Sequence, residues 1–183
     1  MNNPKIDKIV KALKPFSSIR EANAAVSILL KPTEQDLNIL FVKRVENPRD
    51  LWSGQIALPG GKRDPKDRDL KETVMRETLE ETGINLESCR FLGVTEPIRS
   101  RVNPEMKVLP FVFLIENEPI IKLNRDELER YHWIPIKDLV KNERIVKFRL
   151  KEHSAFIIGD IEIWGLTFRI LKSFLRVINR GSY

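Results

Sequence analysis

The chain has 183 residues, of which 42% are hydrophobic and 32% are charged, and its formal net charge at pH 7 is +6. This length and composition fit a soluble globular domain with a sizeable core and exclude a mainly disordered chain. The sequence contains no apolar stretch long enough to span a membrane, and its first residues lack the apolar core of a signal peptide.

The cysteine count and the charge pattern limit the compartment and the partners. Cys89 is the single cysteine, so no internal disulfide can form, which fits the reducing cytoplasm where we expect this protein. Cys89 begins an apolar run without a nearby histidine, which favours packing over catalysis. The positive net charge favours anionic partners. Because the basic residues are scattered, we expect a small anionic ligand, with nucleic acid as the less favoured alternative and no membrane partner.

The predicted elements alternate between helices and strands along the chain. In order they are a helix at 5–14, strands at 24–30, 38–43 and 55–58, a helix at 70–82, strands at 91–96, 107–115 and 131–134, a helix at 135–139, strands at 144–148 and 155–163 with a hairpin turn at Gly159-Asp160, and a helix from 164 or 165 to 179. The continuous apolar run at 107–115 predicts burial on both faces. The pattern indicates one α/β domain over residues 1–183, with a mixed sheet covered by helices on both faces.

The helix predicted at 70–82 carries three carboxylates close together. Glu77, Glu80 and Glu81 fall within roughly a 100° arc of one helix face. A dense acidic cluster repels itself and needs a counter-charge, for which a divalent cation is suited. Arg76 lies one turn before Glu80 and can orient its carboxylate through an ion pair.

A Gly60-Gly61 turn precedes this helix, and its backbone can approach a ligand closely. Gly83 can end the helix in the left-handed conformation. The side chains expected to face the core lie opposite the glutamates, which are then expected to face solvent: Met75, Thr78, Leu79 and Thr82. The alternative is a solvated acidic face with an ordinary glycine stop, but the combined pattern favours a site where a divalent metal meets phosphate.

Residues 61–84 resemble the Nudix box, the signature of Nudix hydrolases, G-x5-E-x7-R-E-U-x-E-E-x-G-U, in which U is a bulky apolar residue. Gly61 stands at the first glycine, and the second half of the box matches at Arg76, Glu77, Glu80, Glu81, Gly83 and Ile84. One extra residue lies between Gly61 and Arg76, so no Glu stands at the early acidic position, and Thr78 replaces an apolar residue. The acids left as substitutes are Asp64, Asp67 and Asp69.

Stretches outside the box are similar to the coenzyme A pyrophosphatase branch of this family. Leu58-Pro59-Gly60-Gly61 is preceded by Arg44, Arg49 and Gly54, although the spacing from Arg49 to Gly54 is one residue longer than in that branch. Two downstream stretches are also similar, Val108–Val112 and Ile163–Thr167. The resemblance covers the chain from about residue 25 to about residue 175.

The resemblance implies the Nudix α/β/α sandwich and metal-dependent hydrolysis of a pyrophosphate bond in a nucleoside diphosphate linked to another moiety. Coenzyme A or its derivatives are the leading substrate, with 3′,5′-ADP and 4′-phosphopantetheine as products. ADP-ribose, dinucleoside polyphosphates and nucleoside triphosphates are the alternatives within the enzyme class. A nucleotide-binding module without catalysis and an RNA-directed protein are the alternatives outside it, and the resemblance also allows a homodimer.

The family roles carry over to particular residues. Glu77, Glu80 and Glu81 would bind Mg²⁺ or Mn²⁺ together with the carbonyl of Gly61, and Arg76 would orient the glutamates. One of these glutamates, or an acid on a later loop, would act as general base, and the later candidates are Glu127 and Glu129. The residues expected to contact substrate phosphates are Arg44, Arg49, Gly60, Lys62 and Arg99. Trp52 is expected either to stack on a base or to cover the core, and His132 to be structural rather than a base.

Overall fold

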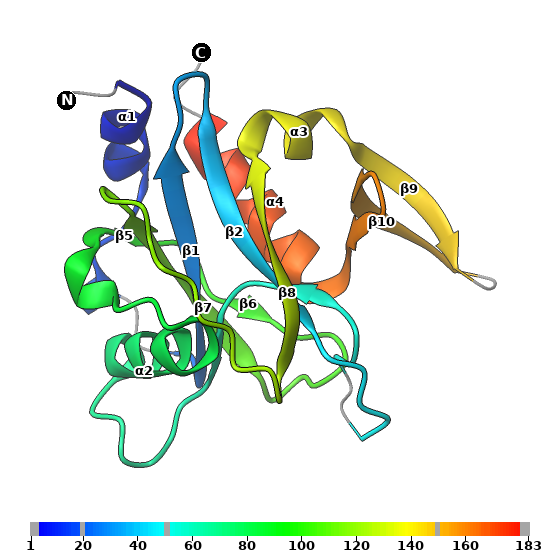
Figure 1. Cartoon of the computed structure of the whole chain (residues 1–183), viewed down its shortest axis with the longest axis horizontal. Coiled ribbons are helices and arrows are strands. Elements are labelled where there is room, and N and C mark those ends of the chain that lie inside the picture. The colour runs from blue at the N-terminus through cyan, green and yellow to red at the C-terminus, as the bar shows by residue number, and fades with distance from the viewer. Residues whose placement is uncertain (1–3, 19–20, 50–51, 149–150, 180–183) are drawn as a thin grey trace.

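The computed structural model describes residues 4–18, 21–49, 52–148 and 151–179. An eight-stranded mixed sheet forms its centre, with the order β3-β2-β1-β7-β5 and with β4 beside β1, β6 beside β7 and β8 beside β2 (Figure 1). Strands β1 and β7 are parallel and the other pairs are antiparallel. The strands are β1 Ala24–Pro32, β2 Leu37–Arg44, β3 Ile56–Ala57, β4 Gly60–Lys62, β5 Arg90–Val94, β6 Ile98–Arg99, β7 Lys107–Leu114 and β8 Leu128–Pro135.

A second sheet of three strands stands beside the large one, with the order β11-β10-β9 (Figure 1). Its strands are β9 Glu143–Phe148, β10 Lys151–Ile158 and β11 Ile161–Ile163. The α-helices are α1 Pro4–Ala12, α2 Leu70–Thr82, α3 Ile136–Lys141 and α4 Gly165–Asn179, and short 3₁₀ turns cover Phe16–Ser18 and Leu86–Ser88. Within the described residues, no helix is both long and apolar enough to cross a membrane.

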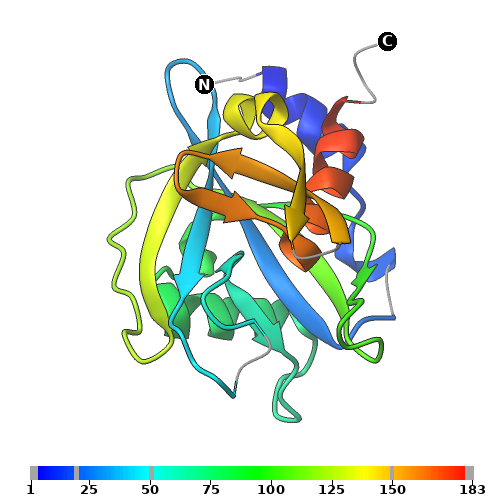
Figure 2. The ribbon, with the colours of Figure 1, turned by 90° about the vertical axis from the view of Figure 1, so that its right-hand side faces the viewer.

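Helices cover both faces of the large sheet, as predicted. On one face, Leu70 and Val74 of α2 pack with Leu109 and other side chains of the strands. On the other face, α1 and α4 contribute Ile9 and Phe174 to a second apolar cluster. Figure 2 shows α1, α4 and the small sheet together on that second side. The fold is therefore an α/β/α sandwich with a mixed sheet, and β7 is buried along nearly its whole length, as its apolar sequence predicted.

Strands β1 and β2 diverge, and the Gly60-Gly61 segment fits into the space between them. The two strands pair over Leu30–Pro32 and Leu37–Ile39 only. Further from their connecting turn, β1 pairs with β4 and β2 pairs with β3. The backbone N–H of Ser27 donates to the carbonyl of Pro59 at 2.8 Å. The Gly60-Gly61 segment, which the sequence predicted as a turn, is therefore the start of a short strand held against β1.

Three further elements differ from the sequence prediction. Strand β8 begins at Leu128 rather than at residue 131. Its first residues are extended because they pair with β2, and their polar side chains give no strand pattern in the sequence. The short strand β6 was not predicted, since two residues carry no periodicity. The hairpin turn predicted at Gly159-Asp160 is confirmed and separates β10 from β11, but β10 begins at Lys151 rather than at residue 155.

We expect Gly60→Ala to destabilise the protein by at least about 2–3 kcal/mol. Gly60 has a φ of +143°, and a Cβ there would lie 2.2 Å from the carbonyl oxygen of Ala25. The matched control is Gly159→Ala, because Gly159 also has a positive φ of +61° but has nothing within 4 Å of the added carbon. The control should cost only ~1 kcal/mol. Urea unfolding of both variants measures the difference, and equal losses would contradict the close packing of Gly60 on β1.

Candidate active site

The helix α2 has well-defined ends. Asp69 is its N-cap, and the Asp69 carboxylate accepts a hydrogen bond from the N–H of Glu72. Gly83 ends the helix with a φ of +73°, and its N–H donates to the carbonyl of Leu79 at 2.8 Å. Both boundaries agree with the sequence prediction. Because Asp69 serves as a cap, it is not the acid that replaces the early Glu of the box.

The orientation of α2 differs from the prediction. Leu79 is 47% exposed, whereas Thr78 and Glu81 are buried. The hydroxyl groups of Thr78 and Ser27 lie 3.0 Å apart, which joins the helix to β1 through a buried polar contact. The expectation that Leu79 faces the core was wrong, and so was the expectation that Glu81 faces solvent. The physical reason is that β1 and β4 offer hydrogen-bonding groups to this side of the helix, so polar side chains pack there.

Glu81 lies against the glycine strand. Its Oε2 accepts a hydrogen bond from the N–H of Gly60 at 2.9 Å, and its Oε1 lies 4.0 Å from Nη1 of Arg44. The side chain is only 5% exposed. Burial raises the pKa of Glu81 to about 8, although the hydrogen bond from Gly60 opposes this shift. The charge of Glu77 raises this pKa further, so Glu81 holds a proton readily while no cation is near.

Glu77 occupies the space that a side chain on Gly61 would need. A Cβ on Gly61 would lie 2.5 Å from Cδ of Glu77, so only glycine lets this carboxylate lie against the β4 backbone. Partial burial raises the pKa of Glu77, the ion pair with Arg76 opposes the shift, and the charges of Glu80 and Glu127 add to it. Negative charge is therefore concentrated beside the glycine strand.

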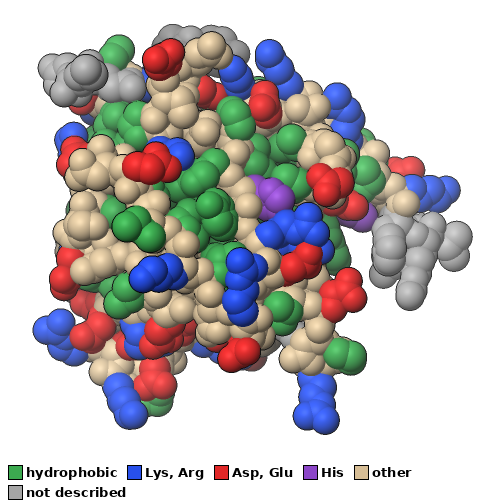
Figure 3. Space-filling model, in the orientation of Figure 1, with side chains coloured by type: hydrophobic (Ala, Val, Ile, Leu, Met, Phe, Trp, Pro, Cys, Tyr) green, Lys and Arg blue, Asp and Glu red, His purple; other side chains and the backbone are tan. Residues whose placement is uncertain are grey.

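One guanidinium group holds two of the three box glutamates. Nη1 of Arg76 lies 2.8 Å from Oε1 of Glu77 and 3.1 Å from Oε2 of Glu80. The Nε and Nη2 atoms of the same arginine donate to the two carboxylate oxygens of Asp67 at 3.0 and 2.9 Å. This planar, two-pronged contact fixes the direction of the guanidinium, which in turn directs Glu77 and Glu80. Figure 3 shows acidic and basic side chains gathered around α2.

Asp67 is the acid that meets Arg76, among the three that the sequence left open. Its carboxylate is buried and also accepts hydrogen bonds from the N–H of Asp64 at 3.0 Å and from the hydroxyl of Thr73 at 2.9 Å. The hydrogen bonds from Arg76 hold the pKa of Asp67 far below its usual range despite burial. A sequence signal for this role existed. Asp67 stands six residues after Gly61, the spacing of the early Glu in the box, so the extra residue follows it.

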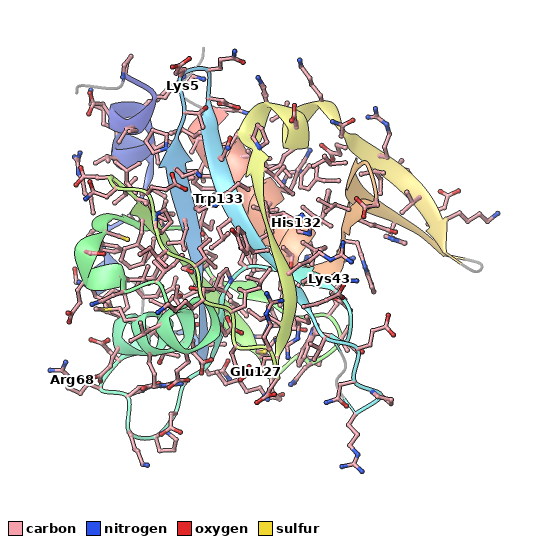
Figure 4. The ribbon with its side chains drawn as sticks, in the orientation of Figure 1. Lys5, Lys43, Arg68, Glu127, His132 and Trp133 are labelled. Carbon is pink, nitrogen blue, oxygen red and sulfur yellow. The ribbon has the colours of Figure 1, made fainter. Side chains whose placement is uncertain are left out.

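A bulge in β8 separates the two candidate loop acids. Lys43 pairs with Arg130 and Arg44 pairs with Leu128, so Glu129 is the extra residue. The carboxylate of Glu129 lies 2.6 Å from Nζ of Lys43 and 2.6 Å from Nη2 of Arg130, away from the box glutamates. Figure 4 labels Lys43 on β2 and Glu127 just before β8, where the carbonyl of Glu127 accepts a hydrogen bond from the N–H of Val45 at 2.9 Å.

Glu127 is the candidate that the structure brings to the cluster. Its charge raises the pKa of both Glu77 and Glu81. The side-chain amide of Asn124 donates to Glu127 at 2.9 Å, and the backbone N–H of Asn124 donates to the carbonyl of Glu81 at 2.9 Å. Asn124, which sequence reasoning missed, thus ties the later loop to α2. No local pattern marks this residue as a site residue.

The expected phosphate contacts divide into two groups. Arg44 and Gly60 touch Glu81, and Lys62 is exposed at the end of β4. By contrast, the backbone N–H of Arg49 donates to the side chain of Asn47 in an exposed loop. Arg99 lies on β6, where its Nη1 donates to the carbonyl of Pro104 at 2.8 Å. The structure therefore brings Arg44 and Gly60 to the acidic helix and gives the Arg99 guanidinium another contact, while Lys62 and Arg49 are exposed.

The structure also shows the positions of Trp52 and His132, the two aromatic residues whose roles the sequence left open. Trp52 packs against the apolar cluster on the α4 side of the sheet, which favours the core-covering role. His132 is partly buried on β8, and this burial together with the nearby Arg130 lowers its pKa. In Figure 4, His132 and Trp133 are neighbours on this strand. The partly buried position of His132 agrees with the expectation of a structural histidine.

The donor chemistry of the acidic cluster fits a hard divalent cation. Carboxylate oxygens and backbone carbonyls are the ligands that Mg²⁺ prefers. Burial is the main cause that raises the pKa of Glu77 and of Glu81, and neighbouring acids add to both shifts. Within the described residues, no three acidic, histidine or cysteine side chains already form a closed ligand set. Arg76 meets Glu77 and Glu80 instead. Because Glu80 is 56% exposed, its side chain is free to turn toward an ion.

Comparisons with known proteins decide the family. The sequence model of the NUDIX domain matches residues 21–154. The chain belongs to the Nudix family. Nudix hydrolase 3 of Caenorhabditis elegans is 29% identical in an alignment that covers 89% of this chain and 77% of that protein. A human relative named mitochondrial coenzyme A diphosphatase NUDT8 is 27% identical and covers 90% of this chain and 72% of its own.

Solved Nudix structures share the fold. A crystal structure of the C. elegans Ap4A hydrolase in a binary complex has a TM-score of 0.55 and 20% identity, and covers 64% of this chain and 83% of its own. The NUDIX domain of Shewanella oneidensis NrtR, crystallised with ADP-ribose, has a TM-score of 0.54 and 16% identity, and covers 99% of both chains. These structures show the fold, whereas the family model and the relatives named as hydrolases show that this chain is a Nudix hydrolase. Enzymes of this family use divalent metal ions and act on small nucleotide substrates.

We expect Asp67→Asn to lower kcat by roughly 10- to 100-fold, because the guanidinium of Arg76 loses its charged anchor and no longer directs Glu77 and Glu80. The control is Asp64→Asn in the same loop, since asparagine can still accept the hydrogen bond that Asp64 receives from the N–H of Lys66. Steady-state kinetics with a saturating divalent metal compares the two variants. Equal activity would show that the contact between Asp67 and Arg76 does not support the site.

Glu81→Gln should stabilise the metal-free protein at alkaline pH. The folded state raises the pKa of Glu81 to about 8, above the ordinary value of 4.5. Between these values the folded state keeps a proton that the unfolded chain releases, so the free energy of unfolding falls as pH rises toward and through 8. Glutamine avoids this loss and can still accept the N–H of Gly60.

The measurement is urea unfolding with a chelator present at several pH values between 5 and 9. The advantage of the Glu81→Gln variant should grow with pH, whereas Glu80→Gln, at an exposed position, should change the profile little. An advantage that is constant across this range would contradict a protonated, buried Glu81.

Proposed function

We propose that this Nudix hydrolase cleaves the pyrophosphate bond of coenzyme A or its derivatives with Mg²⁺ or Mn²⁺, and releases 3′,5′-ADP and 4′-phosphopantetheine. The observation that carries the hydrolytic part is the packing of Glu77 and Glu81 against the Gly60-Gly61 strand, beside Arg44. The substrate choice is supported by the name of the human relative and by the sequence similarity to the coenzyme A pyrophosphatase branch. ADP-ribose and dinucleoside polyphosphates stay as alternatives.

Each residue has a proposed task in this reaction. Glu77, Glu80 and Glu81 hold the metal with the carbonyl of Gly61. A divalent cation bound there neutralises phosphate charge and lowers the pKa of a bound water. Arg44, whose Nη1 lies 4.0 Å from Glu81, is placed to meet a phosphate that approaches the same carboxylate.

The general base is proposed to be either Glu127 or one of the box glutamates. Glu127 is held by the side-chain amide of Asn124, so one of its carboxylate oxygens has a fixed donor while the other is left for water. Its charge also raises the pKa of Glu77 and of Glu81, which supports a role for Glu127 beside the same carboxylates. A Glu127→Gln variant with normal turnover would assign the proton transfer to a box glutamate.

Two properties of the whole chain are also proposed here, its domain organisation and its compartment. We infer that residues 1–183 work as one domain, because α1 and α4 complete the apolar cluster under the sheet that carries the site. The single Cys89 supports a reducing compartment such as the cytoplasm, whereas the name of the human relative places that protein in mitochondria.

We expect Glu80→Gln to lower kcat by about a hundredfold or more without unfolding the protein, because this side chain is exposed and its proposed task is to hold the metal. The matched control is Glu72→Gln on the same helix, where the carboxylate only pairs with Arg68. A near-normal rate for Glu80→Gln would contradict the site. Ligand binding without turnover of the native protein in either metal would favour a binding module.

The substrate is tested with a panel of coenzyme A, ADP-ribose, diadenosine tetraphosphate and nucleoside triphosphates, each with Mg²⁺ and with Mn²⁺. Coenzyme A should give the highest kcat/KM and release 3′,5′-ADP, which chromatography separates from AMP. If ADP-ribose or the dinucleotide is cleaved well and coenzyme A is not, the substrate assignment is wrong while the hydrolase assignment stands.

A further inference from the structure

Strand β9 forms an open edge of the small sheet. Within the described part of the chain, β9 pairs with β10 alone, and it runs along the outer margin of the molecule in Figure 1. An open edge presents backbone N–H and C=O groups that another strand can pair with. Ile145, in the middle of β9, is 74% exposed, whereas most large apolar side chains of the described strands are buried or partly buried.

The register of the hairpin shows which backbone groups face outward. Glu143 and Phe156 are the last register partners of the hairpin, and one residue further the N–H of Ile157 donates to the carbonyl of Asn142 at 3.0 Å. In an antiparallel ladder the bonded pairs alternate, so the residues that bond to β10 are the even-numbered ones. The odd-numbered residues therefore turn their N–H and C=O groups to the open edge: Glu143, Ile145 and Lys147.

A side-chain contact agrees with this direction. Nη1 of Arg144 donates to the carbonyl of Glu143 at 2.8 Å and to the carbonyl of Lys141 at 3.0 Å. A carbonyl engaged in the β9–β10 ladder would not need this partner. The contact covers one outward acceptor while the edge is unpaired, and the carbonyl keeps a second lone pair for a strand that docks there.

The side chains of this edge are complementary to a second copy of themselves. If two β9 strands pair antiparallel about Ile145, residue 145 lies opposite its own copy and Glu143 lies opposite Lys147 of the other chain. Glu143 also pairs with Lys172 of its own α4, so its carboxylate would be shared between the two lysines. Opposite charges then face each other at both ends, and an apolar pair lies between them. All outward backbone groups at these three positions fall into bonded pairs in this register.

Apolar surface next to the edge would be covered by the same contact. Glu143 lines a pocket of about 300 Å³ between the small sheet and α4, together with Val140, Phe156 and Leu175. Ile145 lies two residues further along β9, on the same face as Glu143. Val140 itself is 51% exposed. A second β9 would bring another Ile145 beside this apolar surface.

We propose that two copies of this chain associate by antiparallel pairing of their β9 strands about Ile145, which joins the two small sheets into one of six strands. The charge pattern Glu143–Ile145–Lys147 favours a copy of the same chain over an unrelated strand, because the pattern is its own complement. The contact is separate from the acidic helix, so it stands or falls independently of the hydrolytic activity. The competing interpretation is that Arg144 and Lys147 keep the edge unpaired, as charges on edge strands do.

Sedimentation velocity of the whole protein over a wide concentration range tests the proposal. The native protein should reach a dimer at high concentration. Ile145→Lys places two lysines opposite each other, and Lys147→Glu places glutamate opposite Glu143, so each should raise the dissociation constant at least ~tenfold. The control Lys11→Glu makes the same charge change on α1 and should leave association unchanged. Circular dichroism and turnover of each variant check that the fold is kept.

Disulfide trapping tests the register. In a Cys89→Ser background, Ile145→Cys should cross-link to its own copy under mild oxidation, because paired residues bring their Cα atoms within the range of a disulfide. Glu143→Cys alone should not cross-link, whereas a mixture of Glu143→Cys and Lys147→Cys chains should. A native protein that is monomeric at every concentration overturns the proposal. A dimer that survives both charge variants, or a different cross-linking pattern, overturns it too.

Discussion

The contact between Arg76 and the buried carboxylate of Asp67 is the interaction on which the site depends. A guanidinium with three carboxylate partners would have no preferred direction on a helix surface. Two parallel hydrogen bonds to Asp67, which is itself held by Thr73 and by the backbone of Asp64, remove that freedom. The remaining nitrogen then holds Glu77, which lies against the glycine strand, and the exposed Glu80. The loop before α2 thus acts as the support of an acidic cluster that would otherwise spread apart.

The sheet supplies the second half of the support. Because β1 and β2 diverge, β3 and β4 fit beside them, and the Gly60-Gly61 backbone lies directly under α2. The buried carboxylate of Glu81 accepts a hydrogen bond from the N–H of Gly60. The carboxylate of Glu77 fills the space that a side chain on Gly61 would need. Burial of carboxylates is unfavourable for their charged form, and it is tolerated here beside a site built to receive a cation. The cost in stability and the catalytic potential have the same structural origin.

Much of this arrangement could be predicted from the sequence. The bounds of α2, the alternation of strands and helices, the cover on both faces of the sheet and the family all follow from local periodicity, capping residues and the box motif. Which side of α2 packs against the sheet could not be predicted, because this depends on the contact between Thr78 and Ser27, which lie far apart in sequence. Glu127 and Glu129 are equivalent in the sequence, and only a bulge in β8 sends them to different partners. Asn124 carries no motif at all. These choices are made by tertiary contacts, for which one sequence holds no periodic signal.

The two neighbouring glycines of β4 are required for different reasons. A side chain at position 60 would meet the backbone of β1, which cannot move without disturbing the central sheet, whereas a side chain at position 61 would first meet the carboxylate of Glu77. In a library that covers every substitution, position 60 would be depleted when cells are sorted for the abundance of the protein. Position 61 would be depleted when they are sorted for its activity. Substitutions at two adjacent positions would thus be removed for different reasons, at position 60 because the protein folds poorly and at position 61 because the enzyme loses activity.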